Sequence, residues 1–267
     1  MSITFSSCFY ILKSKFDAKI YINWMNNFIS IVNNFNLVIY TDENSCCYID
    51  TKENPKIKIV IKPIEQFYNY KYKDLWIQNH KSNLLLKDAI TWEVNMLWNE
   101  KIWFVNETIQ KKYFNTDLYG WCDIGYFRNR IKDLHTNQLS KWPCETNLGK
   151  LNTEKIHYAC INNNNIELNY LFQIVKNKNS KGLPEAPLPP KQQSVAGGFF
   201  ILHKDKIDWW RETYDNKLQL YFENNYLIKD DQMIILDCIF SNLDKFNLIR
   251  ENNRRYDNWF LFQRYLL

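Results

Sequence analysis

The first 61 residues constrain the fold more than any other part of the chain, because short apolar segments alternate with one amphipathic segment. Residues 4–12, 37–41 and 57–61 are rich in β-branched and aromatic side chains, which predicts three strands. Between the first two, residues 17–33 carry apolar side chains at helical spacing, and Asp17 is a suitable N-cap. The order strand, helix, strand, strand favours an α/β fold with a parallel sheet.

The rest of the chain continues this alternation with no internal repeat and no change of composition, so we predict a single domain of 267 residues. Further strands are expected at residues 118–122, 156–161 and 195–202. Helices are expected at residues 88–112, 205–221 and 229–242. Loops or irregular segments are expected at residues 67–80, 129–151 and the Pro-rich stretch 177–193. The predicted fold class is α/β: a Rossmann-like domain with a mostly parallel central sheet flanked by helices.

Composition excludes several classes of protein. The net charge of +5 comes from basic and acidic side chains spread along the chain, without the basic stripe that nucleic-acid binding requires, so we expect no nucleic-acid partner. The 7 Cys are odd in number, and we see no Cys-x-x-Cys and no signal-peptide pattern, which predicts reduced thiols and a cytoplasmic location. The apolar runs are too short for a membrane span.

The segment Tyr119–Arg128 is the first candidate for chemistry. Here an apolar strand ends in one carboxylate, Asp123, and Gly125 follows two residues later. Ligands of open α/β sheets lie at the carboxyl ends of strands, where a carboxylate can hold Mg²⁺ or Mn²⁺ against a diphosphate. The alternative is that Asp123 only caps the turn that follows it.

Two later segments are weaker candidates. Ala196–Phe200 places two glycines before an apolar strand, which permits close contact with a ligand but is more often a bulge or tight turn. Asp230, Asp231 and Gln232 begin an apolar helix, where an Asp is commonly a cap. A carboxylate there can also activate or orient an acceptor hydroxyl.

In their order along the chain, these motifs resemble the HtrL/YibB family of glycosyltransferase-like proteins. The resemblance spans roughly Phe5 to Tyr265, and its most specific part is the pattern Trp-x-Asp-x-Gly-x-Phe-Arg. The matching pieces are residues 40–43, 97–105, 121–128, 196–200 and 231–232. The resemblance implies a GT-A fold, which is a nucleotide-sugar-binding α/β sheet. A similar motif order occurs in the glycogenin-like and lipopolysaccharide galactosyltransferase families.

Carried over residue by residue, the resemblance implies that Asp123 binds the metal and that Asp231 is the catalytic residue. The implied donor-binding residues are Ser6, Ser7, Tyr10, Lys101, Trp121, Asp123, Gly125 and Arg128. The implied sugar- and acceptor-binding residues are Gly197, Gly198, Phe199 and Gln232. Residues 1–128 would form the nucleotide-binding half and residues 129–267 the acceptor side.

Two departures from the pattern bear on the metal. Trp121 stands where the first Asp of an Asp-x-Asp motif is usual, and no His follows Asp231. Either Mn²⁺ or Mg²⁺ relies on diphosphate oxygens and water, or Lys101, Arg128 and the pair Arg254–Arg255 neutralise the leaving group without a metal.

We therefore predict a metal-assisted glycosyltransferase that moves a sugar from a nucleotide-sugar donor to a glycan or other hydroxyl acceptor. The main alternative is a catalytically degenerate protein of the same fold that binds nucleotide or glycan, and a glycosidase using Asp123 and Asp231 is another. The aromatic residues 256–265 either cover the acceptor or complete the core, and the aromatic surface leaves a homodimer open.

Overall fold

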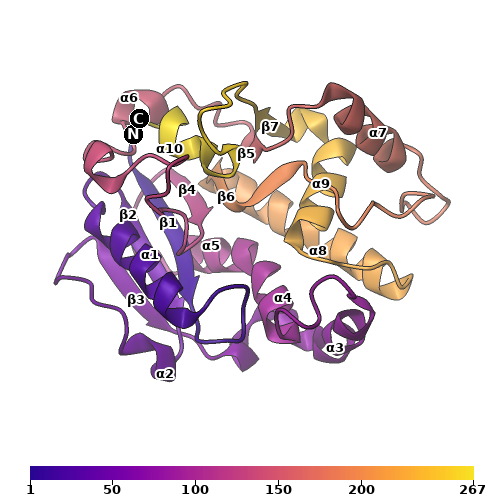
Figure 1. Ribbon diagram of the computed structural model, residues 1–267, viewed down its shortest axis with the longest axis horizontal. Helices are drawn as coiled ribbons and strands as arrows, with labels where there is room; N and C mark the ends of the chain where they lie inside the picture. Colours follow the sequence, from indigo (N-terminus) through magenta and orange to yellow (C-terminus); the bar gives the residue numbers. More distant parts are fainter.

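The computed structural model describes residues 1–267, which are built around one seven-stranded sheet with the strand order β3-β2-β1-β4-β6-β5-β7 (Figure 1). The strands are β1 (Ile3–Phe9), β2 (Asn36–Thr41), β3 (Ile57–Ile61), β4 (Leu118–Cys122), β5 (Ile156–Cys160), β6 (Val195–His203) and β7 (Phe246–Ile249). The longer helices are α1 (Ala18–Ser30), α3 (Lys73–Ser82), α4 (Trp92–Trp98), α5 (Lys101–Gln110), α7 (Asn165–Lys176), α8 (Ile207–Glu223) and α9 (Asp231–Ser241). Shorter helices are α2 (Glu43–Cys46), α6 (Glu145–Leu148) and α10 (Leu261–Tyr265).

The sheet is mixed, which corrects the prediction of a mostly parallel one. Strands β1, β2, β3 and β4 run parallel to one another, and β5 runs parallel to β7. Strand β6 is antiparallel to both of its neighbours, β4 and β5. As a result, the first residues of β6 lie at the same edge of the sheet as the last residues of β4.

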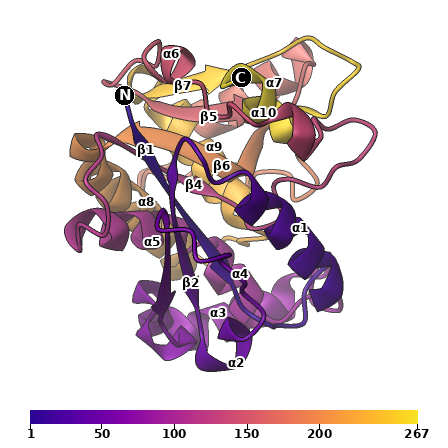
Figure 2. The same ribbon diagram turned by 90° about the vertical axis from the view of Figure 1, so that its left-hand side faces the viewer.

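Helices cover both faces of the sheet, as Figures 1 and 2 show. On one face α1 and α10 pack against β1, β2 and β6 through a cluster that includes Phe28, Phe199 and Phe262. On the other face α5, α8 and α9 enclose a second cluster that includes Trp103, Trp121 and Tyr214. No helix combines the length and the apolar character that a membrane crossing needs.

Most of the predicted elements are present. Strands β3 and β4 have the predicted bounds, and the other predicted strands differ by a few residues at their ends. Helix α1 begins after Asp17, whose side chain accepts a hydrogen bond from the Lys19 amide as an N-cap does. The region 177–193 is a loop, as expected.

Three predictions were wrong or incomplete. The stretch 67–80 is not a loop: it holds a 3₁₀ turn and α3, whose buried face includes the polar Asn79, so its apolar residues have no clean period. The predicted helix 88–112 is two helices, α4 and α5, because polar groups are buried at the break between them. Helix α7 lies in an Asn-rich stretch where we had expected no element.

The break between α4 and α5 is a network of buried polar side chains. Asn99 donates to the Asn95 carbonyl at 2.8 Å and accepts from the Tyr214 hydroxyl at 2.5 Å. The carboxylate of Glu100 accepts from the amides of Tyr68 and Asn69 at 2.7 and 3.0 Å. These bonds fix the position from which α5 starts, and its first residue is Lys101.

Gly120 provides a test of how closely β4 and β6 must approach. A Cβ added there would collide with the backbone carbonyl of Phe200, which cannot move without distorting the sheet. We expect Gly120→Ala to reduce the free energy of unfolding by roughly 1–3 kcal/mol. Chemical denaturation of the purified variant measures this change.

Gly149→Ala is the matched control, because the nearest atoms to its added Cβ are two carbonyl oxygens at 3.5 Å, an ordinary contact. We expect this substitution to leave stability nearly unchanged. Equal stability of the two variants would contradict the close approach of β4 and β6.

Candidate active site

A cavity of about 430 Å³ opens at the edge of the sheet where β1 and β4 end and β6 begins. Its walls come from the loop after β1, the facing ends of α4 and α5, the turn after β4, the start of β6, the start of α9 and the C-terminal segment. The lining residues fall within 8–21, 94–101, 121–130, 197–198, 230–232 and 257–260. Segments distant in sequence therefore meet around one hollow.

At the floor of this cavity one ammonium group joins two carboxylates. The Nζ of Lys101 lies 2.9 Å from Oδ2 of Asp231 and 3.2 Å from Oδ1 of Asp123. It also donates to the carbonyl of Gly197 at 2.9 Å. The side chains of Lys101 and Asp231 are only 7% and 5% exposed, whereas that of Asp123 is 39% exposed. Asp123 is thus the member of this triad that a ligand meets first.

Burial and charge determine the ionisation of the triad. Burial opposes the charged form of Lys101, but the carboxylates of Asp123 and Asp231 outweigh it, so the pKa of Lys101 lies above its usual range. Burial raises the pKa of Asp231, and the ammonium of Lys101 counteracts this only in part. Asp231 is therefore a stronger base than an ordinary surface carboxylate.

The two glycines of β6 give both carboxylates their space. A Cβ at Gly197 would lie 2.6 Å from Oδ2 of Asp231, and a Cβ at Gly198 would lie 2.8 Å from Oδ2 of Asp123. The Asp123 amide also donates to the Gly198 carbonyl at 2.9 Å, and Trp121 Nε1 donates to Asp123 Oδ1 at 2.6 Å. These contacts orient the Asp123 side chain and leave its Oδ2 without a hydrogen bond.

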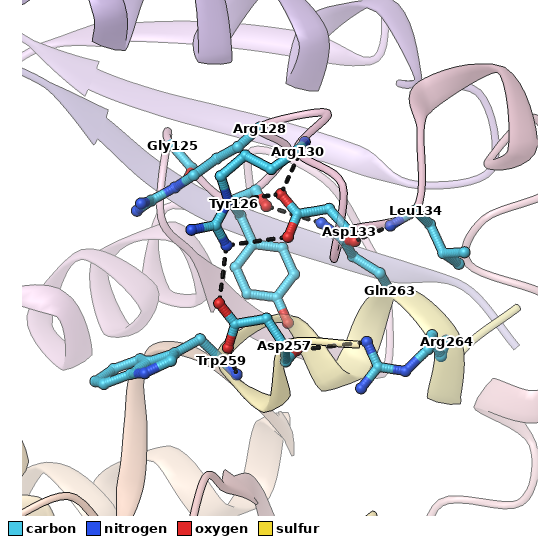
Figure 3. Close-up of polar contacts among 10 residues, drawn as sticks. All are labelled: Gly125, Tyr126, Arg128, Arg130, Asp133, Leu134, Asp257, Trp259, Gln263 and Arg264. Carbon is cyan, nitrogen blue, oxygen red and sulfur yellow. Dashed lines mark hydrogen bonds and ion pairs between the residues drawn. The ribbon is translucent and has the colours of Figure 1, made fainter. Parts of the chain in front are cut away.

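The C-terminal segment holds the turn after β4 in place (Figure 3). Gln263 donates to the Tyr126 carbonyl at 2.9 Å and accepts from the Leu134 amide at 3.0 Å. Arg130 joins Asp133 and Asp257 at 3.0 and 2.9 Å. The turn and the tail thus form one wall of the cavity, from which the side chains of Arg128 and Trp259 extend to the same side in Figure 3.

Two cations of the cavity pair with no carboxylate. Arg128 donates through Nε to the Gly125 carbonyl at 2.8 Å, and its guanidinium carbon lies 4.1 Å from the ring centre of Trp24 and 5.1 Å from that of Phe260. Lys15 Nζ lies 4.6 Å from the ring centre of Trp98. Burial lowers the pKa of both groups, so each charged form would gain from a nearby anion.

Most of the site residues expected from the sequence line this cavity. They are Tyr10, Lys101, Trp121, Asp123, Gly125, Arg128, Gly197, Gly198, Asp231 and Gln232. Three do not, which corrects their placement. Ser6 pairs with Thr108 at 2.7 Å inside the protein, Ser7 is fully buried, and Phe199 packs against Phe262 in the core.

Several cavity residues were not recognised in the sequence. Lys15 lies outside every motif, Trp98 belongs to the matching piece 97–105 but was given no role, and Asp257 lies in a tail that showed only basic and aromatic character. The sequence suggests that Asp230 caps the helix that follows it, but its side chain makes no capping hydrogen bond. Its buried Oδ1 accepts no hydrogen bond from the protein. Whether an Asp that precedes a helix caps it can be decided only from the three-dimensional structure.

The residues present do not fit a resident divalent cation. No group of three or more His, Cys, Asp and Glu side chains is arranged to hold a metal. Lys101 neutralises one of the two negative charges of Asp123 and Asp231 and repels a divalent cation at the free oxygen of Asp123, by about 4 kcal/mol at a separation of about 8 Å and an effective dielectric constant of about 20. The expected Mn²⁺ or Mg²⁺ at Asp123 would therefore find one free carboxylate oxygen beside an ammonium, with no cluster of protein ligands arranged around it.

Comparison with known proteins does not assign the chain to a family. The chain matches no known protein family, and no curated protein sequence is significantly similar to it. The resemblance in motif order to HtrL/YibB-like proteins therefore stays a prediction.

The buried carboxyl of Glu100 generates a prediction about pH. Burial raises its pKa from 4.5 to about 7, although the amides of Asn69 and Tyr68 favour the charged form. The pKa of Glu100 is thus higher in the folded chain than in the unfolded chain. The stability that this carboxyl contributes is therefore present below about pH 4.5 and is lost as the pH rises to about 7. The expected loss is on the order of 3 kcal/mol.

We expect Glu100→Gln to remove this part of the pH dependence, as measured by denaturant unfolding between those two pH values. Glu65→Gln, at an exposed position, serves as the control and should keep the wild-type slope. If wild type and Glu100→Gln lost stability in parallel, the carboxyl would not hold its proton in the folded state.

Proposed function

We propose that this protein is a glycosyltransferase that moves a sugar from a nucleotide-sugar donor to a hydroxyl group of a glycan or other acceptor. The observation that carries the proposal is the triad of Asp123, Lys101 and Asp231 on the floor of the cavity. It lies at the carboxyl ends of β1 and β4, where open α/β sheets bind nucleotides and other ligands.

The walls of the cavity suit a ligand that has both phosphates and sugar rings. Its volume of about 430 Å³ falls in the range of small-molecule sites. Arg128 and Lys15 offer positive charge to a diphosphate. Trp98 and Trp259 line the cavity and offer aromatic surfaces to sugar rings.

Asp231 is suited to accept the proton of the acceptor. In the proposed step the acceptor oxygen forms a bond to the anomeric carbon, and the bond between that carbon and the diphosphate oxygen breaks. The electron pair leaves with the nucleoside diphosphate, and the acceptor proton passes to Oδ1 of Asp231, the oxygen that Lys101 does not hold. The raised pKa of Asp231 supports this role.

Within this proposal the fold is of the GT-A type, residues 1–128 bind the nucleotide and residues 129–267 receive the acceptor. All 7 cysteines are free, which fits a reducing compartment such as the cytoplasm. A glycosidase that uses Asp123 and Asp231 is the other enzymatic candidate, because the raised pKa of Asp231 also suits a carboxyl that must carry a proton.

The proposal is tested by incubating the protein with a panel of sugar nucleotides and measuring released nucleoside diphosphate, with and without glycan acceptors. We expect one donor to be consumed, and Asp231→Asn to reduce its turnover by about 10²- to 10⁴-fold because the proton acceptor is lost. Binding of the nucleoside diphosphate should persist in this variant, since Arg128 and Lys15 remain.

Asp244→Asn changes an exposed carboxylate in the turn before β7, distant from the cavity lining, and is the control with expected wild-type turnover. Full transfer activity in Asp231→Asn would eliminate its role as the base. Tight nucleotide binding with no turnover of any donor would instead favour the catalytically degenerate binding protein.

A further inference from the structure

The cavity contains an internal cation at the place where the proposed chemistry would call for a metal. Lys101 Nζ donates hydrogen bonds to Asp231 Oδ2 and to the Gly197 carbonyl, and it forms an ion pair with Asp123 Oδ1 at 3.2 Å. An ammonium has three N–H donors, so two of them are used within the protein and the third faces Asp123. Its positive charge nevertheless stays between the two carboxylates that would otherwise attract a divalent ion.

We propose that the nucleoside diphosphate of the donor binds without a divalent cation, with Lys101 taking the place of the metal between Asp123 and Asp231 and with Arg128 and Lys15 binding the phosphates. This inference rests on the proposed function, because it concerns how that site holds its donor.

Lys101 cannot easily leave its position. It is the first residue of α5, and the preceding residue, Glu100, is fastened to the amides of Tyr68 and Asn69. Its side chain is buried, so swinging out would leave Asp231 as an unpaired carboxylate in the interior, which is strongly destabilising. The cation is therefore a built-in part of the site.

Arg128 is prepared to bind an anion. Its Nε is used by the Gly125 carbonyl and its flat face packs near Trp24 and Phe260, so the orientation of the guanidinium is set. It forms no ion pair, in contrast to Arg130 two residues later, which is held by Asp133 and Asp257. A fixed guanidinium with free terminal N–H groups matches the geometry of phosphate oxygens.

Lys15 lies on the loop between β1 and α1 and lines the same cavity as Arg128. The next residue, Phe16, packs near Arg128, whose guanidinium carbon lies 5.6 Å from the Phe16 ring centre. Among the acidic groups, Asp230 and Asp231 act most strongly on the charge of Lys15, and Asp123 acts most strongly on that of Arg128. Both unpaired cations are therefore available to a diphosphate bound in the cavity.

The first experiment is calorimetric titration of the protein with UDP, GDP, ADP and CDP, in EDTA and again in MnCl₂. We expect one of these nucleotides to bind in EDTA with an affinity within about twofold of that in MnCl₂. Arg128→Ala should weaken this binding about 10- to 100-fold, because a charge-assisted contact is lost. Arg250→Ala, at an exposed arginine outside the cavity lining, should leave it unchanged.

Binding that appears only with Mn²⁺ would overturn this inference and leave the proposed function intact. Absence of binding under both conditions would overturn both. Equal loss of affinity in Arg128→Ala and Arg250→Ala would show that the phosphates lie elsewhere.

The second experiment uses Mn²⁺ alone as the probe and follows its electron paramagnetic resonance signal. Wild type should leave Mn²⁺ free, whereas Lys101→Met, which removes the ammonium but keeps most of the apolar side chain, should bind it roughly a thousandfold more tightly. Mn²⁺ should also raise the melting temperature of this variant and not that of wild type. Wild-type binding as tight as that of the variant would overturn the inference, and if Lys101→Met does not fold, the titration in EDTA decides it alone.

Discussion

The contact on which the site depends is the single ammonium of Lys101 shared by Asp123, Asp231 and the Gly197 carbonyl. Burying the carboxylate of Asp231 close to that of Asp123 without a compensating charge is unfavourable, and the ammonium of Lys101 offsets part of that penalty. The same contact ties together four elements: the start of α5, the turn after β4, strand β6 and the start of α9. The cavity floor is therefore an electrostatic cross-link as well as a binding surface.

Other features follow from placing that ammonium. Helix α5 begins at Lys101, and the buried side chains of Asn99 and Glu100 form the break between α4 and α5 that sets this starting point. Strand β6 runs antiparallel to β4, so that its early residues meet Asp123. Its third and fourth residues are Gly197 and Gly198, because a Cβ at either position would strike a carboxylate. The C-terminal segment then closes one wall by holding the turn that carries Arg128.

Sequence patterns predicted the parts of the fold that local chemistry determines. The bounds of β3 and β4 followed from apolar runs, and the cap of α1 followed from Asp17. The break at Asn99 did not, because apolar periodicity continues through it and only tertiary hydrogen bonds interrupt the helix. Ser6 and Ser7 do not line the cavity for a related reason: the cavity lies at the carboxyl end of β1, so Cys8, Phe9 and Tyr10 line it, whereas Ser6 and Ser7 lie earlier in the strand and are buried.

The most direct test of the whole account is a crystal structure of the protein soaked with the nucleoside diphosphate that binds it, in the presence of EDTA. The account predicts that the diphosphate lies in the cavity between Arg128 and Lys15, with Lys101 still joining Asp123 and Asp231 and no metal beside them. A diphosphate bound outside this cavity, or one that displaces Lys101 from the two carboxylates, would contradict it.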